Sequence, residues 1–195
     1  CISRREVDQL TDQLRRQKRK AMAYHAGMTP VQRHKTQDAF RAESCDLVVA
    51  TVAFGMGINR SNVRFVMHTG MPKSIEHYQQ ETGRAGRDGL EAECVLLYSP
   101  GDPVKWKRLA EKSIQESDAE VPPEYLQSVH RHIDEMELFC RPGRCRHRHL
   151  VEHFGQTYAG ESCAACDVCL DEFPTVPDSQ VIAQKILSCV YRVQE

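Results

Sequence analysis

Short β-branched apolar runs alternate with capped helix starts along the first hundred residues of the chain. The runs occupy residues 47–51, 63–68 and 94–98, and each is apolar enough to be buried on both faces of a sheet. Capping boxes at residues 3–6 and 29–32 predict two helix starts among these runs. Alternating strands and helices predict an α/β fold with a parallel sheet flanked by helices.

A parallel sheet of this kind binds its ligands at the carboxyl ends of its strands. Thr51 directly follows the first run, and a Gly-Met-Gly loop follows at residues 55–57. Taken alone, Thr51 is best explained as the cap of a helix or turn. Both features nevertheless lie where the fold predicts a ligand.

A glycine-rich arginine pair occurs in residues 78–89, which read Y-Q-Q-E-T-G-R-A-G-R-D-G. Arg84 and Arg87 lie three apart, after a short helix expected to begin near Ser74, so their guanidinium groups can point the same way. Guanidinium groups bind phosphate oxygens in pairs and stabilise the charge of a transferring phosphoryl group. The pattern indicates arginine fingers, whereas an isolated R-x-x-R would be a solvated basic turn.

The string Q-x-x-G-R-x-G-R resembles motif VI of superfamily 2 helicases, and Tyr78 with residues 87–89 narrows the resemblance to the RecQ family of DNA helicases. Other segments resemble the end of motif IV, the A-Y-H-A-G signature, motif V and the strand after it, in the family's order: residues 1–4, 23–28, 46–59 and 63–68. The resemblance implies the second RecA-like lobe of an ATP-dependent 3′-to-5′ DNA helicase in repair and recombination.

The same resemblance implies roles for individual residues. Arg87 would be the catalytic finger and Arg84 its partner. The implied nucleotide-binding residues are Gly57, Gln80, Arg84 and Arg87, and the implied DNA-binding residues are Ser3, Arg4, His25 and Thr51. The implied ligands are ATP with Mg²⁺ and DNA, either single-stranded or at duplex junctions. Single-strand-binding and repair proteins are candidate further partners.

Two motor elements are absent from the sequence, namely a G-x-x-x-x-G-K-[ST] phosphate loop and a D-E-x-H box. In the RecQ family these lie on the first lobe, so we expect this chain alone to hydrolyse no ATP. An alternative is a stand-alone zinc-stabilised module that binds DNA or another partner. An RNA helicase of the same superfamily is a further option, and the cysteines described next count against it.

Four cysteines, Cys145, Cys163, Cys166 and Cys169, have the spacing C-x17-C-x2-C-x2-C. The tight part of this pattern can bring three thiolates to one metal ion, and zinc binds four thiolates tetrahedrally. Disulfides and an iron–sulfur cluster are competing explanations. Cys140 is an alternative first ligand.

The sequence around these cysteines resembles the RecQ zinc-binding module, which implies one Zn²⁺ held by all four, with Cys145 first because arginine follows it. Four thiolates and one Zn²⁺ carry a formal charge of −2. Nearby arginines either neutralise that charge or bind DNA phosphates, and these are Arg141, Arg144, Arg146 and Arg148. We expect Arg146 to be structural and the others to face DNA.

The predicted organisation has three parts: an N-terminally truncated motor lobe (1–100), a helical zinc-binding subdomain (101–173) and the truncated start of a winged-helix domain (174–195). With 26 basic and 27 acidic residues, DNA contacts must come from local patches rather than from net charge. No apolar run approaches the ~20 residues that span a bilayer. We therefore expect a soluble protein, cytoplasmic in bacteria because residues 57–59 resemble bacterial members, or nuclear in eukaryotes.

Overall fold

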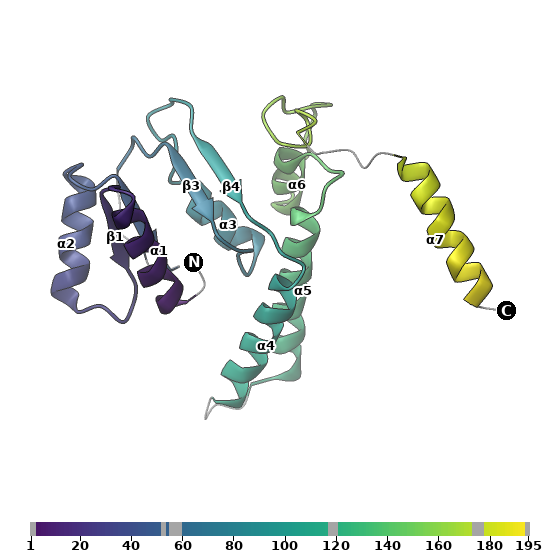
Figure 1. Cartoon of the computed structure of the whole chain (residues 1–195), viewed down its shortest axis with the longest axis horizontal. Helices are drawn as coiled ribbons and strands as arrows, with labels where there is room; N and C mark the ends of the chain where they lie inside the picture. The colour runs from purple at the N-terminus through teal and green to yellow at the C-terminus, as the bar shows by residue number, and fades with distance from the viewer. Residues whose placement is uncertain (1–2, 52–53, 55–59, 117–120, 173–177, 194–195) are drawn as a thin grey trace. The chain divides into compact units, whose positions relative to one another are not determined.

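The computed structural model describes residues 3–51, 54, 60–116, 121–172 and 178–193 (Figure 1). The chain divides into two compact units, Cys1–Cys140 and Arg141–Glu195. The first unit contains the sheets, and the second contains the clustered cysteines.

One parallel strand pair is formed by β1 (Ala21–Tyr24) and β2 (Leu47–Ala50). Helices α1 (Arg4–Arg16) and α2 (Pro30–Arg41) pack against both strands. Each helix starts with the capping box expected from the sequence. The core of this layer is made of side chains less than a tenth exposed, namely Val7, Thr11, Ala21, Tyr24, Thr36, Phe40 and Val49.

A second parallel pair is formed by β3 (Phe65–His68) and β4 (Glu93–Leu96), with α3 (Ile75–Thr82) between them in sequence. The expectation that these strands are buried on both faces is wrong for both, because Phe65 and Met67 of β3 are 47% and 52% exposed and Cys94 of β4 is exposed too. The Phe65 and Met67 side chains line a cavity of about 620 Å³ that Leu10 and Leu14 of α1 also line. Parallel strands flanked by helices confirm the predicted fold class.

A helical hairpin, α4 (Asp102–Gln115) and α5 (Pro123–Cys140), belongs to the same compact unit as the sheets. The indole Nε1 of Trp106 donates to the Met71 carbonyl at 2.6 Å, and the Tyr78 and Phe139 rings lie 5.0 Å apart. Met136 of α5 is fully buried. The hairpin therefore continues the core that holds α3.

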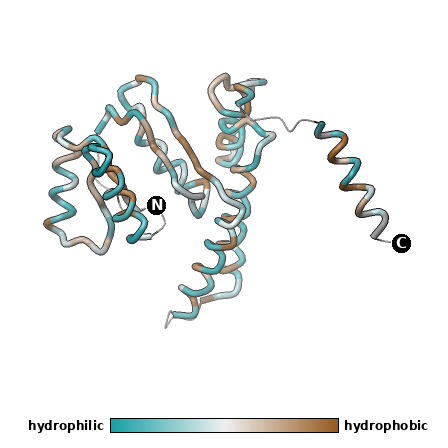
Figure 2. Tube along the Cα trace, viewed as in Figure 1, coloured by the Kyte–Doolittle hydropathy of each residue, from teal (hydrophilic) through white to brown (hydrophobic). Residues whose placement is uncertain are grey.

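The second unit contains α6 (Arg146–His153), the cysteine loop after it and α7 (Ser179–Val193). Hydrophilic and hydrophobic residues are mixed along its helices, as Figure 2 shows. Within the described ranges, no helix of the chain combines the length and the apolarity needed to cross a membrane.

Candidate functional site

The arginine pair lies on a turn that requires glycine. Gly83 ends α3, and Gly86 adopts a positive φ of 65°, which L side chains rarely adopt. A Cβ at Gly86 would lie 3.1 Å from the Leu90 carbonyl oxygen, so space as well as φ selects glycine there. The Gly86 N–H donates to the Val63 carbonyl at 3.0 Å, which fixes the turn beside the start of β3.

Arg84 and Arg87 both lie on this turn and interact electrostatically. Arg84 is half-buried, whereas Arg87 is exposed and donates from Nε to the Gly83 carbonyl at 3.1 Å. Burial and the positive charge of Arg87 lower the pKa of Arg84, against the opposing charge of Glu81. The two cations therefore influence each other, and an anion bound by both guanidinium groups would be favoured by both charges.

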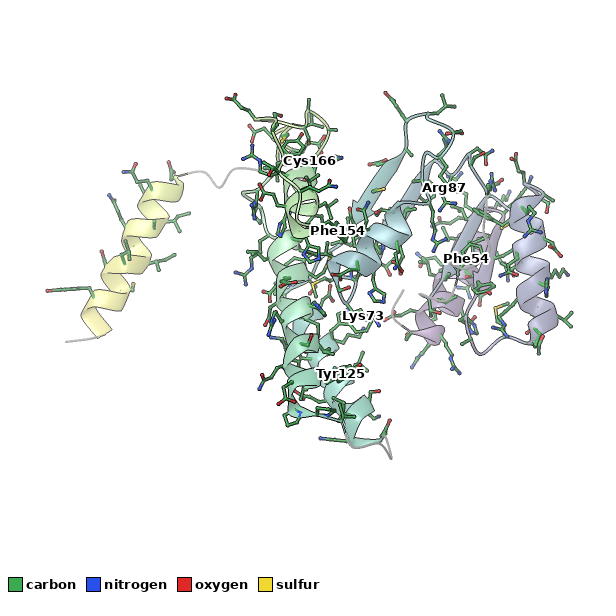
Figure 3. The ribbon with its side chains drawn as sticks, turned by 180° about the vertical axis from the view of Figure 1, so that it is seen from behind. Phe54, Lys73, Arg87, Tyr125, Phe154 and Cys166 are labelled. Carbon is green, nitrogen blue, oxygen red and sulfur yellow. The ribbon has the colours of Figure 1, made fainter. Side chains whose placement is uncertain are left out.

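Helix α3 leads into the arginine turn and contacts β3 through side chains. His68 of β3 is buried, and its Nε2 lies 2.6 Å from Oε2 of Glu81. The His68 ring also lies 5.4 Å from the Tyr78 ring. Arg87 follows α3 and Lys73 precedes it, as labelled in Figure 3. Of the implied nucleotide-binding residues, Gln80 is exposed on α3, and Gly57 lies outside the described residues.

A second group of predicted residues gathers at the carboxyl ends of β1 and β2. Tyr24 pairs with Ala50 in the parallel register, so His25 and Thr51 follow neighbouring strands. The Thr51 N–H donates to the Tyr24 carbonyl at 3.2 Å. Motif position and strand register therefore place these two residues at the same edge.

Arg4 joins this edge through Gly27. A Cβ at Gly27 would lie 3.2 Å from both Cδ of Arg4 and Nδ1 of His25, so the Arg4 side chain passes directly over the glycine. Ser3 precedes Arg4 and caps α1, accepting from the Glu6 N–H at 3.2 Å. The arginine therefore starts a helix whose first turn lies next to the His25 loop.

Both ring nitrogens of His25 have partners within the protein. Its Nδ1 accepts from the Gly27 N–H at 3.2 Å, so the ring hydrogen is on Nε2, which lies 3.1 Å from Oδ1 of Asp8. The side chain is only 10% exposed. Both ring nitrogens are thus engaged, and His25 shapes the turn that carries Gly27 rather than offering a free hydrogen-bond donor.

The four cysteines with metal-ligand spacing come together. The Sγ atoms of Cys145, Cys163, Cys166 and Cys169 all lie within 4.8 Å of one another, and none of these residues is in a disulfide. Cys140, the alternative first ligand, is not a member of this cluster. Four sulfurs at such separations suit a tetrahedral ion with metal–sulfur distances of about 2.3 Å.

The thiols of the cluster differ in acidity. Hydrogen bonding by Ser162 and by the Cys163 backbone lowers the pKa of Cys169 to about 6. Burial raises the pKa of Cys163 to about 11. One thiolate is therefore available near neutral pH, whereas Cys163 releases its proton when it binds a metal.

Arginines near the cluster are mostly engaged inside the module. Arg146 donates to both carboxylate oxygens of Asp167 at 2.9 Å, and Arg148 donates to the Gly160 carbonyl at 2.6 Å. Arg144 pairs with Glu152. Arg146 is structural, as expected, but Arg144 and Arg148 also have internal partners, because the folded loop brings a carboxylate and a carbonyl to them.

Family models match most of the chain in two segments. Residues 1–89 match the helicase conserved C-terminal domain, and residues 100–170 match the RecQ zinc-binding family. The parallel sheets with their arginine turn are therefore a helicase lobe, and the cysteine cluster is its zinc-binding module.

Comparison with individual relatives identifies the helicase family more closely. ATP-dependent DNA helicase RecQ of Pasteurella multocida is 44% identical, and that of Bacillus subtilis is 38% identical, each over 99% of this chain. RecQ-like DNA helicase blm-1 of Caenorhabditis elegans is 36% identical over the whole chain. The chain belongs to the RecQ family of superfamily 2 helicases. It spans 29%, 31% and 20% of the length of these three relatives.

A solved DEAD box protein from the hyperthermophile Methanococcus jannaschii is similar to this chain with a TM-score of 0.48 and 25% identity. The match covers 60% of this chain and 32% of that one.

Proposed function

We propose that this chain is the second motor lobe and zinc module of an ATP-dependent 3′-to-5′ DNA helicase in repair and recombination. The observation that supports this most is that Arg84 and Arg87 follow α3 on one glycine turn, near enough for the charge of Arg87 to act on Arg84. A module that only bound DNA would have no use for paired fingers. The alternative function, a stand-alone zinc-stabilised binding module, gives the two arginines of this turn no role.

In this proposal the arginine turn completes an ATP site whose phosphate loop and Mg²⁺ ligands belong to a first lobe. Arg87 contacts the γ-phosphate when the lobes close, and Arg84 supports it from a half-buried position. Gln80 and Gly57 complete the nucleotide contacts of this lobe. Hydrolysis relaxes the closed state, and this couples ATP turnover to movement along DNA.

The DNA track in this proposal is the edge formed by Ser3, Arg4, His25 and Thr51. Arg4 supplies the charge, and Ser3 and Thr51 supply hydroxyl groups after a helix cap and a strand end. His25 lines the track mainly by fixing the Gly27 turn. Contacts of this kind go to phosphates and sugars, so we expect little base preference.

The zinc proposal assigns one Zn²⁺ to Cys145, Cys163, Cys166 and Cys169. The ion would supply folding free energy to a small module whose loop has little apolar core of its own. Residues 174–195 would begin a winged-helix domain. We propose that the protein associates with DNA, in the cytoplasm of a bacterium or in the nucleus of a eukaryote. Single-strand-binding and repair proteins are candidate partners.

Comparing the chain with the whole helicase that carries it tests the proposal. We expect ATP hydrolysis stimulated by single-stranded DNA, and strand separation, from the whole helicase and neither from the isolated chain. ATP turnover by the isolated chain, or a whole protein that binds DNA without hydrolysing ATP, would favour the alternative.

A further inference from the structure

Arg64 binds the carboxylate that is nearest in sequence to the proposed finger. It immediately precedes β3, and its Nη2 lies 2.5 Å from Oδ2 of Asp88, the residue after Arg87. The two charged side chains are 39% and 24% exposed, so the pair lies at the surface without being fully solvated. The hydrogen bond from Arg64 is the main cause that lowers the pKa of Asp88.

Asp88 is further oriented by the turn itself. Its Oδ1 accepts from the Leu90 N–H at 3.1 Å, while Arg64 binds the other oxygen. Arg64 also donates to the carbonyls of Glu91 and Asn62, at 3.0 and 3.2 Å. Each oxygen of the Asp88 carboxylate therefore has a hydrogen-bond donor, one from the turn and one from Arg64.

Arg87, in contrast, has no carboxylate partner within the described part of the chain, and its side chain is exposed. A carboxylate one residue away attracts an exposed guanidinium, and the attraction is strongest when no other cation binds the carboxylate. An arginine already paired with a carboxylate is a poor ligand for a phosphate, because the negative charge next to it repels the anion.

We propose that Arg64 is a positioning residue that sequesters the Asp88 carboxylate and so keeps Arg87 available for an anionic phosphate. This inference rests on the proposed function, because it gives Arg64 a role only if Arg87 contacts the nucleotide. A different reading is that Arg64 matters only as a brace for the turn, through the Glu91 and Asn62 carbonyls. The two readings make opposite predictions for a double variant.

The test uses the whole helicase and steady-state ATP hydrolysis with saturating single-stranded DNA. Arg64→Ala releases Asp88, and we expect kcat to fall at least about tenfold while KM for ATP changes less than about threefold, as for an interaction made in the transition state. Asp88→Asn keeps the acceptor for the Leu90 N–H but removes the charge. Adding it to Arg64→Ala should restore most of the lost kcat.

A double variant that stays as slow as Arg64→Ala would overturn the proposal in favour of a simple brace. Normal hydrolysis by Arg64→Ala would overturn both explanations. Arg64→Lys, which keeps a cation beside Asp88, should retain more kcat than Arg64→Ala. Arg87→Ala distinguishes a failure of the finger assignment from a failure of the role proposed for Arg64. If Arg87→Ala hydrolyses ATP normally, the finger assignment is wrong; if it is inactive while Arg64→Ala is normal, only the role of Arg64 is wrong.

Discussion

Arg146 and Asp167 form a two-pronged ion pair, with Nε to Oδ1 and Nη2 to Oδ2 both at 2.9 Å. Burial of Asp167 opposes its ionisation, but the hydrogen bonds and charge of Arg146 outweigh this effect and lower the carboxyl pKa. Arg146 lies one residue after Cys145, and Asp167 lies one residue after Cys166. The pair therefore joins the segment that carries Cys145 to the segment that carries Cys166.

The first prediction follows from that pair. Arg146→Ala should lower the free energy of unfolding of the cysteine module by about 1–2 kcal/mol, a value discounted for the partial exposure of Asp167. Arg144→Ala is the matched control. Arg144 also pairs with a carboxylate, that of Glu152, but its side chain is 51% exposed, whereas that of Arg146 is 15% exposed. Urea titration of the zinc-loaded chain measures both. Equal losses would show that the two-pronged geometry adds nothing.

The second prediction concerns the metal. Cys163→Ser should reduce bound zinc from one ion per chain to none and make residues 141–172 sensitive to protease, because the ion contributes folding free energy. Cys189→Ser is the control, since Cys189 is exposed on α7 and outside the cluster. Elemental analysis with limited proteolysis measures the outcome. Iron with a brown chromophore, or unchanged zinc in Cys163→Ser, would contradict the assignment.

The third prediction compares two glycines of the arginine turn. Gly86→Ala and Gly89→Ala both place alanine at positive φ, which costs about 1–2 kcal/mol. Only Gly86→Ala also creates contacts at 3.1 and 3.2 Å, with the Leu90 carbonyl and the Ala92 Cβ, whereas nothing lies near Gly89. We expect the larger loss of unfolding free energy for Gly86→Ala. Equal losses in denaturant titrations would show that the turn relaxes around the added methyl group.

Local features of this fold were predictable from the sequence, and contacts between distant segments were not. The capping boxes at Ser3 and Thr29 were correctly predicted, because a cap depends on residues three positions apart. The cysteine cluster was predictable because its spacing limits which sulfurs can meet. The Arg64–Asp88 pair joins residues 24 apart, and no short pattern in the sequence signals it.

Whether a strand is buried depends on the segments that cover it, and those segments could not be predicted from the sequence of the strand itself. The apolar run at residues 63–68 correctly predicted a strand, but Phe65 and Met67 face a cavity instead of a packed layer. His25 and Thr51 follow the neighbouring strands β1 and β2, but the sequence analysis predicted no strand before His25. The contact of His25 with Asp8 was also missed, since Asp8 is 17 residues away on α1.

The fourth prediction concerns DNA. Arg4→Ala should weaken binding of single-stranded DNA by the chain and reduce the slope of log affinity against log salt by about 0.7, the value for one phosphate contact. Arg16→Ala removes the same charge from the other end of α1 and should change the slope little. Fluorescence anisotropy over a range of salt concentrations measures both. Equal effects would mean that Arg4 acts only through net charge.

In the proposed function, Arg87 is the finger that acts on ATP. Arg87 is exposed, and its hydrogen bond to the Gly83 carbonyl is on the surface, so loss of its side chain should hardly affect folding. Arg41→Ala on α2 removes an exposed arginine paired with Asp38 and controls for charge.

The most direct measurement is DNA-stimulated ATP hydrolysis by the Arg87→Ala form of the whole helicase, with nucleotide and DNA binding measured in parallel. We predict that kcat falls by about 10³ or more, the range found for arginine fingers, while both ligands still bind. Hydrolysis at the rate of the unmodified protein would contradict the account.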